Sequence, residues 1–365
     1  MPRLVHRGNK TVTAIGWLIL AGSLWGQAGP SAGYRYRRAI TIDHTQVAYM
    51  DLSDFPVLIS GSYSDLATVD NGGKVFNGNG YDIVFTDASG TQILTWEMES
   101  YNPATGDLNF WVRVPSLSHT ADTVIYLCYG NPAVTTFQGG AAGSAWDGDY
   151  LAVLHLSDNA ASTTVRDSTA NQGAWHNTTA TSNTADSGQI GGGQTYGGQH
   201  TSGPYLAGTN GATQVTYSAW IRPVNLGDYG GVSETVIAKD IPGPQFLTLQ
   251  TGGLGDSSRY ALVGTVSDGS PAYGYTGPVL SEGTWTYVAM VFDGTQDSNE
   301  GRLSLYVNGV AQEVTFGGTI PAATPDFFKA TGVGFGGNIG SCVDCDGWDG
   351  SIDEVRISGT ARAAG

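Results

Sequence analysis

Short runs of alternating apolar and polar residues constrain the fold of this chain more than any other feature. YRYRRAITID at residues 34–43 and TVIYLCY at residues 123–129 are two of them, and Gly-, Asn- and Asp-containing turns separate such runs. A period of two is typical of half-buried β-strands. Charged residues make up only 13% of the chain, and the shortage of Glu and Lys disfavours long helices. The sequence therefore predicts an all-β protein.

The predicted strands fall into two modules. Those between residues 33 and 138 show no helical periodicity and predict a β-sandwich. Residues 139–149 are rich in Gly and Ala and are interpreted as a linker. Residues 150–365 contain enough strands for two packed sheets, which predicts a jelly roll.

Several motifs follow one another along the second module. They are YSAWIRP at 217–223, GTWTYVAMVFDG at 283–294, LYVNG at 305–309 and GSIDEVRI at 350–357. In this order they resemble the laminin-G-like, concanavalin A-type jelly-roll family. The resemblance implies the fold and says little about the ligand. Trp220 and Trp285 lie inside these motifs, so we expect both rings in the core.

The first module has motifs of its own. They are YRYRR with ITI between residues 34 and 42, FPVL at 55–58, WVRVP at 111–115 and YGNP at 129–132. They resemble a bacterial β-sandwich domain of unknown function that precedes laminin-G-like modules in exported proteins. Some relatives also carry an ExbB/TolQ-type proton-channel module, and no such segment follows here. Cys128 stands where that family usually has an aromatic residue. Because the chain ends soon after the last motif, we expect it to be a fragment or a truncated product.

The first residues resemble a targeting segment. A basic start, an apolar run over residues 12–25 and the small-x-small sequence Gly26-Gln27-Ala28 predict a signal peptide at 1–28. The alternative is an uncleaved anchor. No later segment is predicted to cross a membrane, and the protein is expected to be secreted, periplasmic or at the cell surface. The net charge of -16 disfavours nucleic acid and anionic membranes as partners and suits divalent cations.

Export permits disulfides. Cys342 and Cys345 form CVDC in a Gly/Asp-rich loop, with no helix behind it for a redox motif and no nearby His for a zinc site. We expect a local disulfide, with two free thiols as the alternative. Cys128 is expected to be a buried free thiol.

Asp353 and Glu354 are neighbours in the last predicted strand and should point to opposite faces, so they cannot act together on one bond. One hypothesis makes Asp353 a calcium ligand. The preferred interpretation is structural: one acid pairs with Arg356 or caps a turn. Further calcium candidates lie in two loops, whose spacing is not that of an EF-hand; they are Asp167, Asn171, Asp344, Asp346 and Asp349. An Asx-turn explains Asp167 and Asn171 equally well.

Loop aromatics are the candidates for stacking on a sugar ring, because an aromatic face matches the CH-rich face of a pyranose. They are Tyr229, Tyr273, Tyr275 and Trp348.

Catalytic groups are harder to find. Glu97 and Glu99 share a strand face, and their spacing suits a retaining glycosidase. They lie in the first module, however, whose family shows similar acids without known chemistry. There is no Gly-x-Ser-x-Gly elbow, and the histidines are scattered. The sequence therefore predicts no enzyme.

Three hypotheses remain. The first is an exported binding or adhesion protein that acts on an extracellular or cell-wall glycan, with calcium as its one candidate cofactor. The second is a periplasmic structural or interaction segment of an envelope assembly, with an envelope protein as partner. The third and least favoured is a glycoside hydrolase.

Overall fold

The chain forms two compact units that divide between Asp147 and Gly148. The computed structural model describes residues 32–47, 50–158, 163–177, 182–184, 188–197, 199–226, 234–240, 245–252, 260–270, 272–326, 332–337 and 347–362. Within these ranges, no helix is both long and apolar enough to cross a bilayer. The predicted signal peptide lies outside them.

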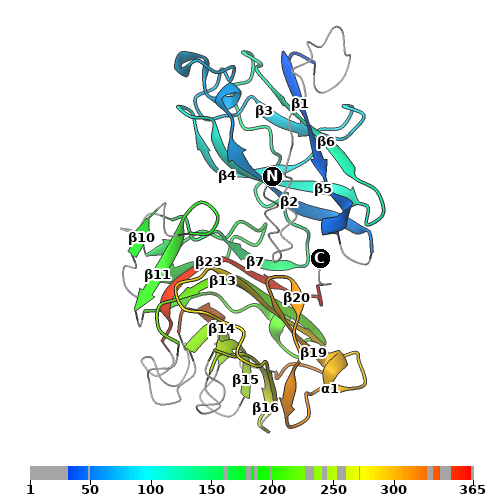
Figure 1. Cartoon of the computed structure of the whole chain (residues 1–365), viewed down its shortest axis with the longest axis vertical. Helices are drawn as coiled ribbons and strands as arrows, with labels where there is room; N and C mark the ends of the chain where they lie inside the picture. The colour runs from blue at the N-terminus through cyan, green and yellow to red at the C-terminus, as the bar shows by residue number, and fades with distance from the viewer. Residues whose placement is uncertain are drawn as a thin grey trace, which may run out of the picture. The chain divides into compact units, whose positions relative to one another are not determined.

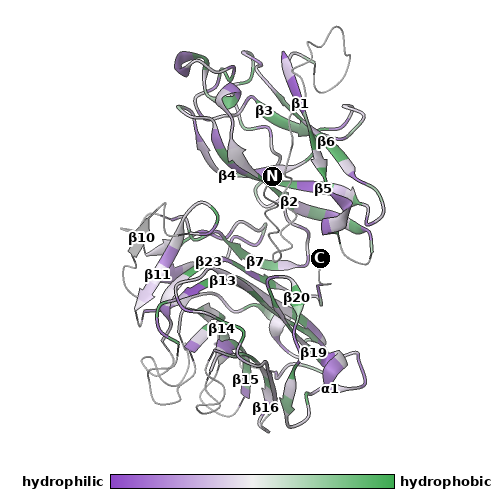
Figure 2. Cartoon of the chain, viewed as in Figure 1, coloured by the Kyte–Doolittle hydropathy of each residue, from purple (hydrophilic) through white to green (hydrophobic). Residues whose placement is uncertain are grey.

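The first unit is a β-sandwich of two antiparallel sheets, in the strand orders β1-β6-β3 and β2-β5-β4. The strands are β1 (Tyr36–Ile42), β2 (Leu52–Ser62), β3 (Ile83–Thr86), β4 (Trp96–Asn102), β5 (Asp107–Leu117) and β6 (Thr123–Tyr129). Hydrophobic residues run along much of β3 and β6 (Figure 2). Their inward side chains join those of the other sheet around Phe85, Trp96 and Phe110, whose rings contact one another.

Aromatic and basic residues alternate over residues 34–37, where β1 begins. The Tyr36 ring packs on the core and stacks on Tyr129, with ring centroids 5.4 Å apart. The Arg37 guanidinium lies 4.5 Å from the centroid of the Tyr126 ring. The Arg37 cation thus rests on an aromatic face of the neighbouring strand β6, which stabilises the edge of the sheet.

The second unit is built from two larger sheets. One has eight strands, in the order β10-β11-β23-β13-β18-β19-β20 with β7 paired to β23, and the other has nine, in the order β21-β17-β16-β15-β14-β22-β12-β9-β8. Figure 1 shows β23 and β13 in one layer and β14, β15 and β16 in the other. The strands of the first of these sheets are β7 (Tyr150–Leu154), β10 (Ser182–Thr184), β11 (Gly193–Gly197), β13 (Gln214–Pro223), β18 (Thr286–Asp293), β19 (Leu303–Val307), β20 (Val310–Ala311) and β23 (Asp349–Ser358). Those of the second are β8 (Thr164–Val165), β9 (Trp175–Asn177), β12 (Thr201–Ser202), β14 (Glu234–Asp240), β15 (Gln245–Thr251), β16 (Leu262–Asp268), β17 (Tyr273–Tyr275), β21 (Thr315–Gly317) and β22 (Gly334–Phe335). A single turn of helix, α1 (Asn299–Arg302), precedes β19.

One hydrophobic cluster fills this second unit with side chains from both sheets. Period-two alternation produces it: Leu247 and Leu249 of β15 belong to the cluster, as do Leu303 and Leu305 of β19. The all-β fold class and the jelly roll predicted from the sequence are thereby confirmed.

One of the two tryptophan predictions needs correction. Trp220 is buried as predicted, although its ring lies on the face of β13 opposite to Ala219 and Ile221 and packs edge-on against Tyr287 at 5.7 Å. Trp285 is only half-buried, with the Arg222 guanidinium 5.1 Å from its ring centroid. The two motifs predict strands at these positions, but they do not indicate which face of each strand points into the core.

Candidate functional site

Two tyrosines stand side by side on the outward face of β17. Gly274, between them, points into the core, because a Cβ placed there would contact the side chains of Val314 and Leu303. Tyr273 and Tyr275 therefore point away from the core. Their rings are half-buried, with centroids 6.4 Å apart and planes inclined at 41°.

Polar side chains of the neighbouring strands continue this face. Tyr273 is in register with Thr265 of β16, and Thr265 with Thr248 of β15. Gln250 shares the face of Thr248, whose hydroxyl donates to Gln250 Oε1 at 2.8 Å. We call the five residues Tyr273, Tyr275, Thr265, Thr248 and Gln250 the β17 face.

The edge strand β21 fixes the position of one ring. Gly317 is in register with Tyr273, and a Cβ placed on Gly317 would lie 2.2 Å from Tyr273 Cζ. The Tyr273 ring therefore lies over the bare glycine backbone. A side chain at residue 317 would displace the ring from this position.

The chemistry of the β17 face suits a saccharide. Two aromatic rings offer apolar surface for CH groups, and the half-buried Thr265 hydroxyl and Gln250 amide beside them offer donors and acceptors for sugar hydroxyls, while the buried Thr248 hydroxyl orients Gln250. Sequence analysis identified the tyrosines and missed Thr248, Thr265 and Gln250. The signal for the β15 residues was present in FLTLQ, where polar residues alternate with core leucines.

The two other predicted stacking residues do not join this face. Trp348 is fully buried in the core cluster, because its segment leads directly into β23, and this corrects the prediction that it presents its ring to a ligand. Tyr229 lies outside the described residues.

Asp353 was the first candidate calcium ligand. Its carboxylate is fully buried, and Oδ2 accepts hydrogen bonds from the backbone N–H groups of Gln189 and Ile190, both at 2.8 Å. Such bonds are charge-assisted and tie a neighbouring loop to β23.

Asp167 holds a turn in the same way. Oδ1 accepts from the N–H groups of Thr169 (2.9 Å) and Val153 (3.3 Å), and Oδ2 accepts from Gly173 N–H at 2.9 Å. The Asn171 side-chain amide donates to the carbonyl of Leu151 at 3.1 Å. The bond to Thr169, two residues on, is that of the Asx-turn that the sequence offered as the alternative to calcium.

Of the remaining calcium candidates, only Asp349 lies within the described residues, as the first residue of β23. Asp349 is exposed. Asp344, Asp346, Cys342 and Cys345 lie outside the described residues.

The predicted calcium ligands do not cluster with other potential metal ligands among the described residues. Among the described residues, Asp43, His44 and Asp122 bring three ligand atoms within 4.8 Å of one another on the surface of the first unit, whereas Asp167, Asp349 and Asp353 belong to no such group.

Glu354, the neighbour of Asp353, occupies an irregular position. Its φ is +52°, where the register between β23 and β13 shifts by one residue. The fully buried carboxylate accepts from Arg356 Nη2 at 2.8 Å and lies 2.6 Å from His155 Nδ1. Burial alone would raise the pKa of Glu354, but the charge and hydrogen bonds of His155 and Arg356 lower it below its ordinary value.

The two glutamates considered for glycosidase chemistry also have structural partners. Glu97 accepts from the indole N–H of Trp146 at 2.8 Å, and Glu99 accepts from that of Trp111 at 2.9 Å. The two indoles contact each other, with centroids 5.5 Å apart. Both carboxylates thus orient a buried tryptophan pair.

The cysteine of the first unit is a free buried thiol. Burial raises the pKa of Cys128, which keeps the thiol protonated and unreactive.

Family profiles match both units. Residues 192–365 match the profile of the concanavalin A-like lectin/glucanases superfamily. Residues 79–178 match that of a domain of unknown function, DUF2341. The chain therefore contains a concanavalin A-like domain preceded by a domain of this unknown-function family, and the predicted arrangement is confirmed.

Solved structures give more distant similarities. Domain 4 of an extracellular arabinanase from Geobacillus stearothermophilus, solved with arabinotriose, is 21% identical with a TM-score of 0.39, over 59% of this chain and 95% of that one. A Bacteroides ovatus protein described as carbohydrate binding is 13% identical with a TM-score of 0.37, over 87% and 78%. A mutant Trypanosoma rangeli sialidase is 14% identical with a TM-score of 0.40, over 68% of this chain and 40% of that one. No curated protein matches the sequence.

Proposed function

We propose that this chain is an exported, non-catalytic binding protein whose jelly roll binds carbohydrate at the β17 face. The observation that carries the proposal is the outward-facing pair Tyr273 and Tyr275, 6.4 Å apart beside a row of polar side chains. Membership of the jelly roll in a superfamily of lectins and glucanases supports the same class of ligand.

The absence of catalysis is proposed from the roles of the acidic side chains. Glu97 and Glu99 hold indole N–H groups, and Glu354 is paired with a histidine and an arginine. A glycosidase needs one carboxyl group to give up a proton and another to attack or to activate water. Acids held in these contacts serve folding.

Calcium dependence is the second part of the proposal. The chain carries a net charge of -16, which favours divalent cations in general. Asp167 and Asp353 already bond backbone N–H groups. We therefore propose Asp344, Asp346 and Asp349 as the residues where calcium would act.

A glycan array probed with the mature chain, once in calcium and once in EDTA, tests this function. We expect binding to a group of related glycans. Binding that survives EDTA would support the β17 face without the ion, and binding lost in EDTA would support both parts. A blank array in both conditions would contradict the proposal and favour the alternative, an interaction segment of an envelope assembly.

A further inference from the structure

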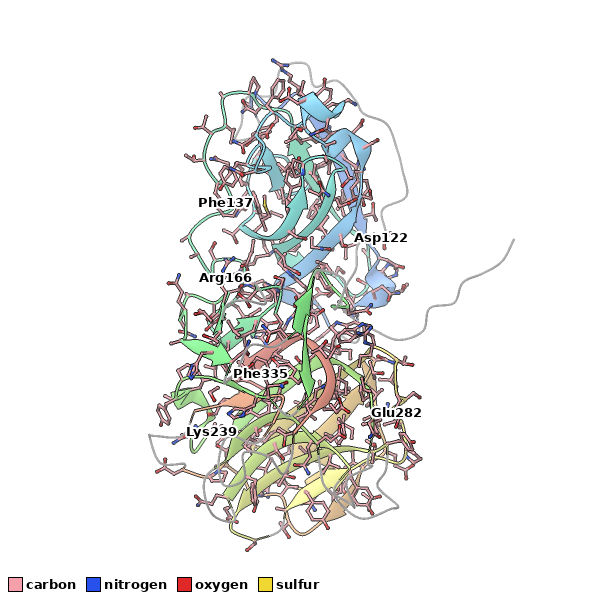
Figure 3. All side chains as sticks on the ribbon, turned by 90° about the vertical axis from the view of Figure 1, so that its left-hand side faces the viewer. Asp122, Phe137, Arg166, Lys239, Glu282 and Phe335 are labelled. Atoms are coloured by element: carbon pink, nitrogen blue, oxygen red, sulfur yellow. The ribbon has the colours of Figure 1, made fainter. Side chains whose placement is uncertain are left out.

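Lys239 occupies an unusual position for a lysine. It lies near the end of β14 (Figure 3). Its side chain is 0% exposed and is among the largest fully buried side chains of the described residues. Lysine is rarely buried to this extent unless something specific holds its amine.

A small group of residues surrounds the amine. Lys239 Nζ donates to Thr209 Oγ1 at 2.9 Å and to Asn210 Oδ1. The Thr209 hydroxyl donates to the Leu206 carbonyl at 2.8 Å, which leaves its oxygen to accept from the amine. The ring of Tyr205 lies over Nζ at 4.7 Å. The amine is therefore held directly against a side-chain amide.

A carboxylate stands on the other side of that amide. Asn210 Nδ2 donates to Asp326 Oδ1 at 3.3 Å. The Asn210 amide thus has an amine next to its oxygen and an acid next to its nitrogen. These are the three groups that an acyl transfer from Asn210 to Lys239 uses: a nucleophilic amine, an amide whose nitrogen departs, and an acid beside that nitrogen.

The amine is also in a suitable protonation state. Burial lowers the pKa of Lys239 to about 8, although the nearby charge of Asp326 opposes the shift. Burial disfavours the ammonium form, so a substantial share of the amine is neutral near that pH. Only the neutral amine is a nucleophile.

We propose that Lys239 and Asn210 become joined by an intramolecular isopeptide bond. Nζ attacks Cγ of Asn210, so that an Nζ–Cγ bond forms and the Cγ–Nδ2 bond breaks. Asp326 accepts a proton from Nζ and delivers one to the departing nitrogen, which leaves as ammonia. The reaction consumes one amine and one amide and needs no oxidant, reductant or cofactor.

The bond would connect the two sheets of the jelly roll. Asn210 lies shortly before β13 of the eight-stranded sheet, and Lys239 lies in β14 of the nine-stranded sheet. The two residues are 29 positions apart in sequence. A covalent link between them closes this stretch of chain into a ring, which lowers the conformational entropy of the unfolded state. It also keeps β14 joined to the segment before β13 if the two sheets separate.

A second reaction at Asn210 also releases ammonia and has to be distinguished. Asn210 precedes Gly211, and attack by the Gly211 nitrogen would form a succinimide. In the folded chain the Gly211 N–H donates to the Pro325 carbonyl at 3.1 Å, which holds that nitrogen away from Cγ. Succinimide formation would not attach Asn210 to the Lys239 amine.

Peptide mapping of the denatured, fully digested native chain by mass spectrometry separates these cases. We expect a branched peptide that contains both Lys239 and Asn210, lighter than its two parts by one ammonia, and no tryptic cleavage after Lys239. Separate unmodified peptides would overturn the proposal. An ammonia loss confined to an unbranched Asn210 peptide would overturn it as well.

Two variants test the assigned roles. Lys239→Met keeps an apolar chain of similar length and should remove the branched peptide and restore the full mass. Asp326→Asn changes an exposed side chain, so it should leave a cooperative thermal transition while the branched peptide falls to a trace. Undiminished cross-linking in folded Asp326→Asn would overturn the role of the acid. A branched peptide in Lys239→Met would overturn the assignment of the amine.

Discussion

At the scale of single residues, two adjacent acids have unrelated tasks. Asp353 binds backbone N–H groups of a neighbouring loop, whereas Glu354 is enclosed with His155 and Arg356. The sequence offered Arg356 as a partner because it is two positions away. It could not offer His155, which is 199 positions away and meets Glu354 only once β7 pairs with β23.

Replacing Glu354 with alanine should strongly destabilise the fold. The change leaves the Arg356 guanidinium buried without its carboxylate, and breaking a buried pair in this way costs about 3–5 kcal/mol. Urea unfolding measures the loss. Glu313→Ala, at an exposed position, is the matched control and should change stability by about 0.5 kcal/mol or less. Equal effects of the two variants would show that the buried pair contributes nothing.

The same carboxylate predicts a dependence on pH. Its folded-state pKa lies below the ordinary value of 4.5, so its stabilising contribution is present above pH 4.5 and is lost as the pH falls through the folded pKa. Glu354→Gln, which cannot ionise, should flatten the acid side of a plot of stability against pH. If stability falls just as steeply at low pH in Glu354→Gln as in the native chain, other groups cause the loss of stability in acid.

At the scale of elements, alternation predicted the strands but not their neighbours. The LYVNG and GTWTYVAMVFDG motifs became β19 and β18, which pair with each other. By contrast, the pairing of β17 with β21 joins segments that carry no mutual signal in sequence, and it is this pairing that positions Tyr273 over Gly317. The two tyrosines of the candidate site could therefore be predicted from the sequence, but the contact that positions Tyr273 could not.

That pairing makes Gly317 a test of the site. Gly317→Ala should displace the Tyr273 ring and weaken glycan binding several-fold, because the new Cβ would lie 2.2 Å from Tyr273 Cζ. Gly277→Ala is the control, since nothing lies within 4 Å of a Cβ there. Surface plasmon resonance with an array-positive glycan gives both affinities. An unaffected Gly317→Ala would place the ligand elsewhere.

The Asp167 turn predicts the outcome of a calcium experiment. Asp167→Ala leaves the buried N–H groups of Thr169 and Val153 without an acceptor, which costs about 1–3 kcal/mol for each unsatisfied group. Thermal unfolding of native and variant chains should show the same loss in calcium and in EDTA. A loss seen only in calcium would make Asp167 an ion ligand instead.

At the scale of the whole molecule, each unit has a hydrophobic core of its own. The family profiles leave residues 179–191 unassigned and extend the first domain to residue 178. Strand pairing places the domain boundary earlier than the family profiles do. β7 pairs with β23, and β8 and β9 belong to the nine-stranded sheet, so all three are strands of the second unit. Those short strands belong physically to the jelly roll, because their backbone groups are bonded there.

The central claim is that the jelly roll binds carbohydrate through the β17 face. Calorimetric titration of an array-positive glycan into the native chain, Tyr275→Ala and Tyr306→Ala tests it most directly. Tyr306 is also half-buried, but it lies on β19 of the other sheet. Removing a stacking aromatic should cost about 1.4 kcal/mol or more, so we predict that Tyr275→Ala raises Kd at least about tenfold while Tyr306→Ala leaves it unchanged. Native affinity in Tyr275→Ala, or a loss of affinity in Tyr306→Ala, would contradict the account.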